Sequence, residues 1–148
     1  MDRIDVLDGV LVSPLKRIEH HLGDILHGIK KSDQGYNGFG EAYFSTIIKG
    51  EIKGWNRHRQ MTMNLVVPIG SVTFVLWKGS EDENRKYQIE TLSLENYQRL
   101  TIPPGIWVGF RGNSEPNNLI LNIADLEHDP HEKEFKNINE CIFDWNNI

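Results

Sequence analysis

The sequence contains one cysteine, Cys141, among its 148 residues. A single thiol excludes an internal disulfide, and it is too few for a cysteine zinc site or an iron–sulfur cluster. The sequence also lacks any run of about 18 apolar residues that would cross a membrane. Its first residues have neither the basic start nor the apolar run of a signal peptide. The cytoplasm is therefore the expected compartment.

Basic residues are outnumbered, since 16 Lys and Arg against 21 Asp and Glu give a formal net charge of −5. This balance argues against nucleic acid or an anionic membrane as a partner, although a small anionic ligand can still bind in a locally basic pocket. The length is that of one domain, expected to span residues 1–148.

The sequence also lacks any long segment with the periodicity of a helix. It contains instead short segments in which apolar and other side chains alternate. The pattern is clearest at residues 72–77, where the side chains alternate with the period of two typical of a strand. Strands are expected at 41–48, 52–58, 61–69, 72–77, 87–91, 99–102, 107–111 and 119–124. Short strands separated by turn residues indicate an all-β antiparallel sandwich or barrel. We expect an irregular arm at 1–35, a core at 36–128 and a tail at 129–148.

One spacing within these strands is specific. Its fixed points are Gly50, Asn56, His58, Met63 and Gly70, followed by a Pro-Pro-Gly turn at 103–105 and Val108. This spacing resembles the paired motif of the cupin superfamily, which implies a double-stranded β-helix, or jelly roll. Metal-binding cupins carry two His and a Glu in the first motif and a third His in the second. Only His58 remains of these four ligands, so we predict no metal and no cofactor.

The surrounding segments narrow the resemblance. GFGEAYFS at 38–45, IKGWNRH at 52–58, the stretch 92–110 and LNIADLEHDPHE at 121–132 are similar to the RmlC-like, nucleotide-sugar branch of the cupins. This branch includes the dTDP-4-dehydrorhamnose 3,5-epimerases and the dTDP-4-keto-6-deoxyhexose 3,4-ketoisomerases, and the resemblance covers about residues 36–132. It places the epimerases' basic His at Asn56, their catalytic Tyr at Asn122 and the ketoisomerases' second His at His58. An inward Lys of the epimerases falls near Met63 or Asn64.

These positions define a candidate site for moving a proton next to a sugar ketone. His58 is the candidate base, and Asn56 and Asn122 are candidate donors to the enolate oxygen. The candidate substrate-binding residues are Lys53, Arg57, Arg59 and Arg111 for a diphosphate, Trp55 and Trp107 for ring stacking, and Asn64. Packing or a dimer interface is the favoured role of the two tryptophans, a solvated face is the ordinary interpretation of the cations, and a hydrogen-bonded core histidine is the alternative for His58.

The resemblance implies an isomerase that acts on a dTDP-4-keto-6-deoxyhexose in surface-polysaccharide biosynthesis, as an epimerase or a ketoisomerase. The alternative is a non-catalytic cupin that binds a nucleotide sugar or a partner enzyme, because several usual catalytic residues are replaced. The resemblance also implies a homodimer with the arm crossing between subunits.

Overall fold

The computed structural model describes residues 2–3, 6–79, 85–141 and 143–148. The described strands are β1 (Asp2–Arg3), β2 (Leu11–Pro14), β3 (Arg17–Ile18), β4 (Ile25–Leu26), β5 (Glu41–Ile48), β6 (Ile52–His58), β7 (Met63–Ile69), β8 (Ser71–Trp77), β9 (Lys86–Ser93), β10 (Gln98–Ile102), β11 (Trp107–Gly112), β12 (Asn117–Ala124) and β13 (Lys133–Phe135). Two short 3₁₀ helices, η1 (Ile138–Glu140) and η2 (Trp145–Asn147), follow them. In this described part of the chain, no helix is long and apolar enough to span a membrane.

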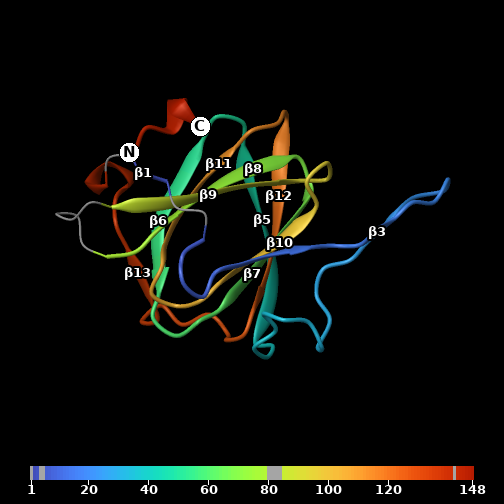
Figure 1. The fold of residues 1–148 in the computed structure, drawn as a ribbon, viewed down its shortest axis with the longest axis horizontal. Coiled ribbons are helices and arrows are strands. Elements are labelled where there is room, and N and C mark those ends of the chain that lie inside the picture. The colour runs from blue at the N-terminus through green and yellow to red at the C-terminus, as the bar shows by residue number, and fades with distance from the viewer. Residues whose placement is uncertain (1, 4–5, 80–84, 142) are drawn as a thin grey trace.

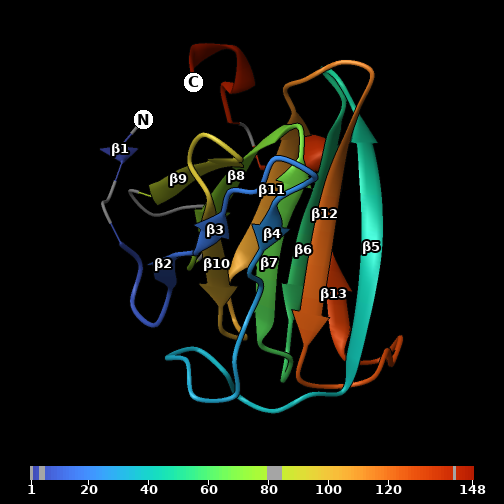
Figure 2. The same cartoon turned by 90° about the vertical axis from the view of Figure 1, so that its right-hand side faces the viewer.

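Most of the strands form two sheets that face each other (Figures 1 and 2). The first sheet has the order β1-β9-β8-β11-β6-β13, and the second sheet has the order β2-β10-β7-β12-β5. Neighbouring strands are antiparallel except for the short pair β1 and β9. The predicted all-β jelly roll is thereby confirmed.

Alternation along each strand sorts side chains between the two faces of its sheet. In β8, Val72, Phe74 and Leu76 belong to the main core between the sheets. Val75 and Trp77 of the same strand belong to a second apolar cluster on the outer face of the first sheet. The main core therefore fills the space between the two sheets. The second cluster lies on the outer face of the first sheet, where another segment must cover it.

The carboxyl-terminal tail provides that cover. β13 pairs with β6, and the buried rings of Phe143 and Trp145 lie 4.8 Å from Tyr87 and 5.6 Å from Trp55, centroid to centroid. Burying large aromatic side chains in this way is a substantial source of stability. The tail therefore packs against the body on the side away from the main core.

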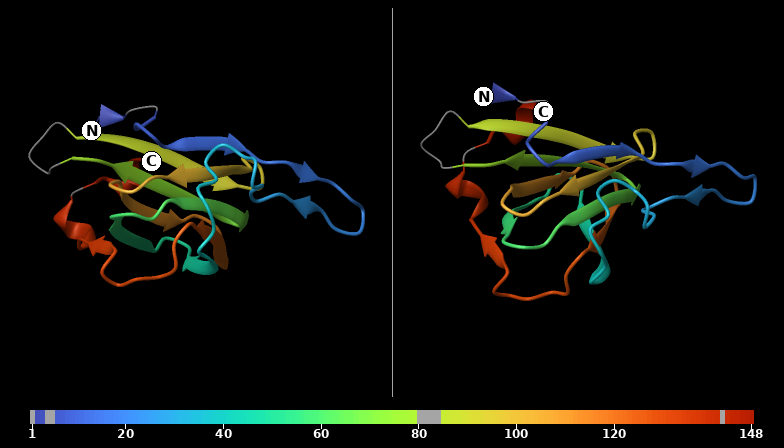
Figure 3. Two further views of the ribbon diagram at one scale, coloured as in Figure 1. Left: turned by 90° about the horizontal axis from the view of Figure 1, so that it is seen from below. Right: turned by 60° about the horizontal axis from the view of Figure 1, so that its bottom comes forward.

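The amino-terminal arm contains short strands where an irregular segment was expected. β2 joins the edge of the second sheet by pairing with β10, which satisfies its backbone hydrogen-bonding groups. β3 and β4 form a hairpin that projects from the body (Figure 3). The remainder of the arm returns across the second sheet before β5 begins.

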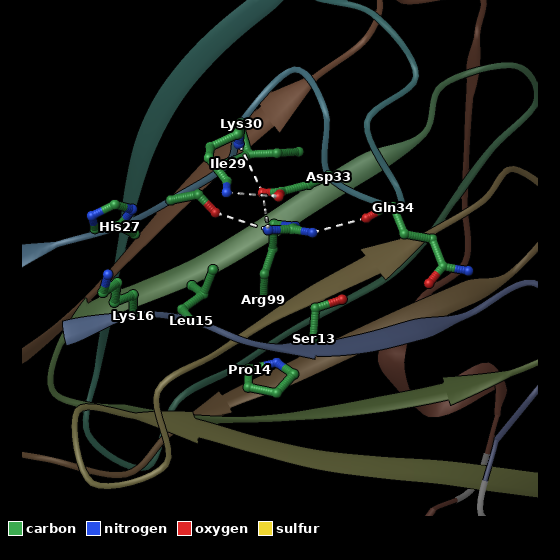
Figure 4. A pocket seen from close by; sticks show the side chains of 11 residues that line it. Ser13, Pro14, Leu15, Lys16, His27, Ile29, Lys30, Asp33, Gln34 and Arg99 are labelled. Atoms are coloured by element: carbon green, nitrogen blue, oxygen red, sulfur yellow. Dashed lines mark hydrogen bonds and ion pairs between the residues drawn. The ribbon is translucent and has the colours of Figure 1, made fainter.

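Arg99 of β10 holds that returning segment in place (Figure 4). Its side chain is only 2% exposed. The guanidinium donates hydrogen bonds to the carbonyl oxygens of Gly28 at 3.0 Å and Gln34 at 2.9 Å, and to Asn64 Oδ1 at 3.1 Å. Asp33 lies 3.4 Å from the same group. One buried side chain therefore ties residues 28–34 to the second sheet, beside a pocket of about 370 Å³.

We expect Arg99→Met to lower the free energy of unfolding by about 3 kcal/mol, because the Asp33 carboxylate and two carbonyl groups lose their buried donor. Urea unfolding followed by circular dichroism measures this change. The matched control is Arg59→Met, since Arg59 is exposed and lies 3.8 Å from its carboxylate partner; its effect should stay within about 0.5 kcal/mol. Equal effects of the two substitutions would contradict the role of Arg99.

Candidate active site

A cavity of about 160 Å³ lies between the two facing sheets. Alternate residues of its strands point into it, because side chains two positions apart share one face of a sheet. The apolar lining is Met63, Leu65, Phe74, Val108, Phe110 and Ile120, and the polar lining is Tyr43, Ser45, Asn56, His58, Asn122 and Lys133. An apolar cavity with a few convergent polar groups is the usual form of a small-molecule site.

His58, at the end of β6, is paired with a carboxylate from the tail. Its Nδ1 lies 2.5 Å from Glu132 Oε1, and both residues are buried. The other oxygen of Glu132 accepts hydrogen bonds from the backbone N–H groups of Gln60 at 2.9 Å and Met61 at 2.8 Å. The two backbone hydrogen bonds therefore hold the Glu132 carboxylate in the orientation in which its other oxygen faces the imidazole.

This environment keeps Glu132 ionised. Burial raises the pKa of the carboxyl, but the hydrogen bonds from His58, Gln60 and Met61 outweigh burial and leave the pKa below its ordinary value. When the imidazole is neutral, an ionised Glu132 favours the tautomer that carries its hydrogen on Nδ1, and the lone pair is then on Nε2. Because Nδ1 is taken, Nε2 is the nitrogen available to a molecule in the cavity, and a neutral Nε2 is a general base.

Asn122 and Tyr43 form a second polar pair on the opposite sheet. The two residues are direct partners in the register of β12 and β5, and Asn122 Nδ2 donates to the Tyr43 hydroxyl at 2.9 Å. Asn122 is 3% exposed, and its Oδ1 has no hydrogen-bond partner among the described residues. Asn56 lines the cavity from β6, two positions before His58. The three predicted catalytic residues, His58, Asn56 and Asn122, therefore come together.

The predicted substrate-binding residues lie elsewhere. Trp55 is fully buried in the second cluster, where its Nε1 donates to the carbonyl of Ile138 at 3.3 Å. Trp107 is in the same cluster, and the Arg57 guanidinium lies over its ring at 4.6 Å. Arg57 also makes a two-pronged ion pair with Glu134, at 3.0 and 2.8 Å. Alternation explains this placement, because Trp55 and Arg57 are the odd positions of a strand whose even positions face the cavity.

The other four candidates are also outside the cavity lining that the described residues define. Lys53 is exposed and donates to the carbonyl of Thr46, and Arg59 is exposed near Glu134. Arg111 donates to Asn113 and to the carbonyl of Trp145, on the tail side of the first sheet. Asn64 accepts hydrogen bonds from Arg99 and Thr101 on the arm side of the second sheet. The structure thus does not bring these seven side chains to the base.

The sequence interpretation missed Tyr43, Glu132 and Lys133, which the structure brings to the site. Tyr43 shares its alternation with Ser45, so the predicted strand at 41–48 already placed both on one face. No such pattern identifies Glu132, which lies in the segment after the last strand of the core and meets His58 only through tertiary structure. The sequence offered one indication of Glu132, namely that it is a carboxylate within the segment 121–132 that resembles the family.

The chemistry of the lining is not that of a metal-binding cupin. Met63 and Val108 stand at the positions of the family's Glu and third His, and both are apolar walls of the cavity. Neither side chain offers the nitrogen or oxygen ligands that divalent cations prefer. The described residues contain no group of three or more His, Cys, Asp or Glu arranged to hold a metal ion. A metal-free site stays a prediction.

A jelly roll with a carboxylate-backed histidine beside amide and phenol groups is a cupin equipped for proton transfer. No family model matches the chain. The "Probable low-salt glycan biosynthesis epimerase Agl13" of Haloferax volcanii is 30% identical over 112 residues, covering 71% of this chain and 72% of that protein. A dTDP sugar isomerase from Desulfovibrio desulfuricans G20 has a crystal structure with a TM-score of 0.87 and 31% identity, covering 95% of this chain and 93% of its own.

A second similar structure shows the fold at lower identity. A point mutant of the 3,4-ketoisomerase QdtA from Thermoanaerobacterium thermosaccharolyticum, in complex with TDP-4-keto-6-deoxyglucose, has a TM-score of 0.72 and 23% identity. It covers 92% of this chain and 96% of its own. The chain belongs to the RmlC-like cupin family of sugar-nucleotide isomerases and epimerases. The prediction of an isomerase is confirmed.

Proposed function

We propose that this protein moves a proton next to the ketone of a nucleotide-linked 4-keto-6-deoxyhexose, and that its product enters a surface polysaccharide or glycan. The observation that carries the proposal is His58, held by Glu132 in the cavity of a sugar-nucleotide isomerase fold. The sugar nucleotide bound to the QdtA mutant and the glycan role in the name of Agl13 support the substrate class and the pathway class.

The geometry supplies the parts that such a reaction needs. A hydrogen on the carbon next to a ketone is removed as the electron pair of its C–H bond moves toward the carbonyl oxygen. His58 Nε2 takes that hydrogen, and the ionised Glu132 stabilises the imidazolium that forms. The Asn56 amide, two positions along β6, donates toward the enolate oxygen. Each group acts on a different part of one small enolate.

The cavity has room for only part of a nucleotide sugar. Ligand pockets commonly measure about 300–1,000 Å³, whereas this cavity measures about 160 Å³. The sugar therefore occupies the interior, and the nucleotide lies outside it. Lys133 is exposed and lines the cavity opposite His58 in the register of β13 and β6. An exposed ammonium beside the cavity can pair with the diphosphate of the substrate.

The test is incubation of the protein with dTDP-4-keto-6-deoxyglucose in heavy water, followed by NMR. We expect deuterium at C3 or C5 and the appearance of an isomeric product. A sugar nucleotide that raises the thermal midpoint without exchange or product formation would contradict catalysis and favour the non-catalytic binding function. Absence of binding, exchange and product would contradict the proposed substrate.

We further propose that the working form is a homodimer, with the β3–β4 hairpin packed on a second copy. The hairpin projects from the body (Figure 3), and Leu22 and Ile25 on it are 83% and 58% exposed. β5 is the edge strand of the second sheet, and its Phe44 and Ile48 are each 64% exposed. Exposed apolar side chains on a projecting hairpin and a free sheet edge are typical of a subunit contact.

We expect the double substitution Leu22→Glu/Ile25→Glu to dissociate this dimer, because carboxylates at the contact would lose their hydration. Light scattering should give wild type about twice the chain mass of 17.1 kDa, and the variant close to the chain mass. Lys31→Glu, at an exposed position beyond the hairpin, is the control and should stay dimeric. A monomeric wild type, or a variant that remains dimeric, would contradict this assembly.

A further inference from the structure

A second pocket, of about 370 Å³, lies at the base of the amino-terminal arm (Figure 4). Its walls are the end of β2, the segment that returns from β4 and the side chain of Arg99 on β10. It shares none of its lining residues with the cavity that contains His58. Small-molecule sites commonly measure about 300–1,000 Å³. The pocket is therefore large enough to be a binding site of its own.

Positive charge predominates in this pocket, although the whole chain has a formal net charge of −5. Lys16, Lys30 and Arg99 belong to the lining, and Asp33 is the one carboxylate among the described residues that form it. Solvent screens the guanidinium only weakly, because the Arg99 side chain is 2% exposed. A concave surface with an excess of positive charge attracts anions and repels cations.

Arg99 and Asp33 are already engaged with each other and with the backbone. The guanidinium lies 3.4 Å from Asp33 and donates to two backbone carbonyl groups and to Asn64. Asp33 also accepts the backbone N–H of Lys30 at 2.8 Å. This ion pair sets the one carboxylate against one cation, so the two ammonium groups supply the excess positive charge.

Lys16 and His27 supply donors that the rest of the protein leaves unused. Neither the ammonium nor the imidazole has a hydrogen bond or ion pair with a described residue. The backbone N–H of His27 donates to the carbonyl of Lys16 at 3.0 Å, which continues the register of β3 and β4 to the base of the hairpin. Residues that are directly opposite in such a register point to the same face. The two side chains are therefore neighbours on one wall of the pocket.

From these observations we propose that the pocket binds the phosphate group of a small anionic molecule. The ammonium groups of Lys16 and Lys30 pair with the phosphate oxygens, and the His27 ring donates a hydrogen bond to them. A phosphate suits this arrangement because it presents several acceptor oxygens to donors from two segments of the chain. The bound group joins the base of the hairpin to the returning segment. The proposal does not depend on the reaction in the cavity of His58.

Histidine NMR locates the bound anion, because His27 lines this pocket and His58 lines the cavity between the sheets. The full chain is titrated with pyrophosphate in a phosphate-free buffer of low ionic strength, and His27→Gln identifies the ring resonance of His27. We expect this resonance to move to saturation in wild type. Lys16→Gln/Lys30→Gln should weaken the binding at least about tenfold, because two charge-assisted contacts are lost.

The matched control is Lys31→Gln/Lys78→Gln, which makes the same change in net charge at exposed residues outside the lining and should bind like wild type. Both double variants should unfold at the wild-type urea midpoint, so that a loss of binding is not a loss of fold. The site is overturned if the His27 resonance does not respond, if it responds equally in Lys16→Gln/Lys30→Gln, or if the His58 resonance alone responds.

Two sources of the phosphate group are distinguished by parallel titrations with inorganic phosphate and with dTDP. Tighter binding of dTDP than of pyrophosphate at His27 identifies a nucleotide as the ligand, since the volume of the pocket then accommodates more than the phosphates. Equal affinities identify the free phosphate or pyrophosphate, and either result supports the site. Because His27 reports on this pocket alone, a protein that fails to exchange hydrogen in the cavity still gives the expected response here.

Discussion

Replacing His58 with Gln should lower kcat about 1,000-fold, within the range that a positioned acid–base group contributes. The substitution removes the proposed general base, while a glutamine amide can still donate a hydrogen bond to Glu132. Deuterium exchange next to the ketone should fall with kcat, because the hydrogen can no longer be removed. KM should change little, since the cavity walls and Lys133 are unaltered.

The control for this prediction is His131→Gln, which makes the same change at an exposed histidine outside the cavity lining. Its kcat should equal that of wild type, and both variants should unfold in urea close to the wild-type midpoint. A His58→Gln enzyme that retained more than about a tenth of wild-type kcat would show that another group removes the hydrogen.

The strands and the three catalytic candidates were predictable for one physical reason. Alternation with a period of two identifies a strand and also assigns each of its residues to a face. Once the motif placed His58 on the inner face of β6, Asn56 had to share that face. The family resemblance identified Asn122, and the alternation of β12, whose buried positions recur every second residue, agrees with its inward position.

The same rule explains why the expected substrate-binding group was not brought to the base. Trp55 and Arg57 are the immediate sequence neighbours of Asn56 and His58, and adjacent residues of a strand point to opposite faces. Trp55 and Arg57 therefore lie on the opposite side of the sheet from Asn56 and His58, although they are adjacent to them in the sequence. The tail covers this outer face, which buries Trp55 and Trp107 and brings Glu134 into an ion pair with Arg57.

Contacts between distant segments could not be predicted from any local pattern. The pair His58 and Glu132 depends on how the tail returns along β6, and the pair Tyr43 and Asn122 depends on which strand borders β12. Local alternation gives the face of each strand but not its neighbour in the sheet. Both pairs lie at the cavity, one on each sheet, and the first fixes the orientation of the His58 imidazole.

Glu132→Gln should lower kcat about 1,000-fold by reversing the tautomer of His58, because the contribution of a positioned base is then lost. The backbone N–H groups of Gln60 and Met61 require an acceptor, so the amide oxygen of Gln must face them. The amide nitrogen then faces His58 Nδ1 and donates to it. The hydrogen of the imidazole moves to Nε2, and the base in the cavity is lost.

Glu132→Ala discriminates this mechanism from a loss of packing. Alanine leaves the imidazole loosely held but free to adopt either tautomer, so its kcat should exceed that of Glu132→Gln even though its fold is less stable. Steady-state kinetics and urea unfolding of both variants measure the two quantities. A Glu132→Gln enzyme more active than Glu132→Ala would contradict tautomer control.

The pH dependence of stability provides an independent check on the charge of Glu132. Its pKa in the folded protein is below the ordinary value of 4.5. The carboxylate therefore contributes stability that is fully present above pH 4.5 and is lost as the pH falls through the lowered pKa. Glutamine does not titrate, so the stability of wild type relative to Glu132→Gln should decline between about pH 5 and pH 3. A difference in unfolding free energy that stayed constant over this range would mean that Glu132 is not held as an anion, and His58 would then lack the partner that keeps Nε2 free.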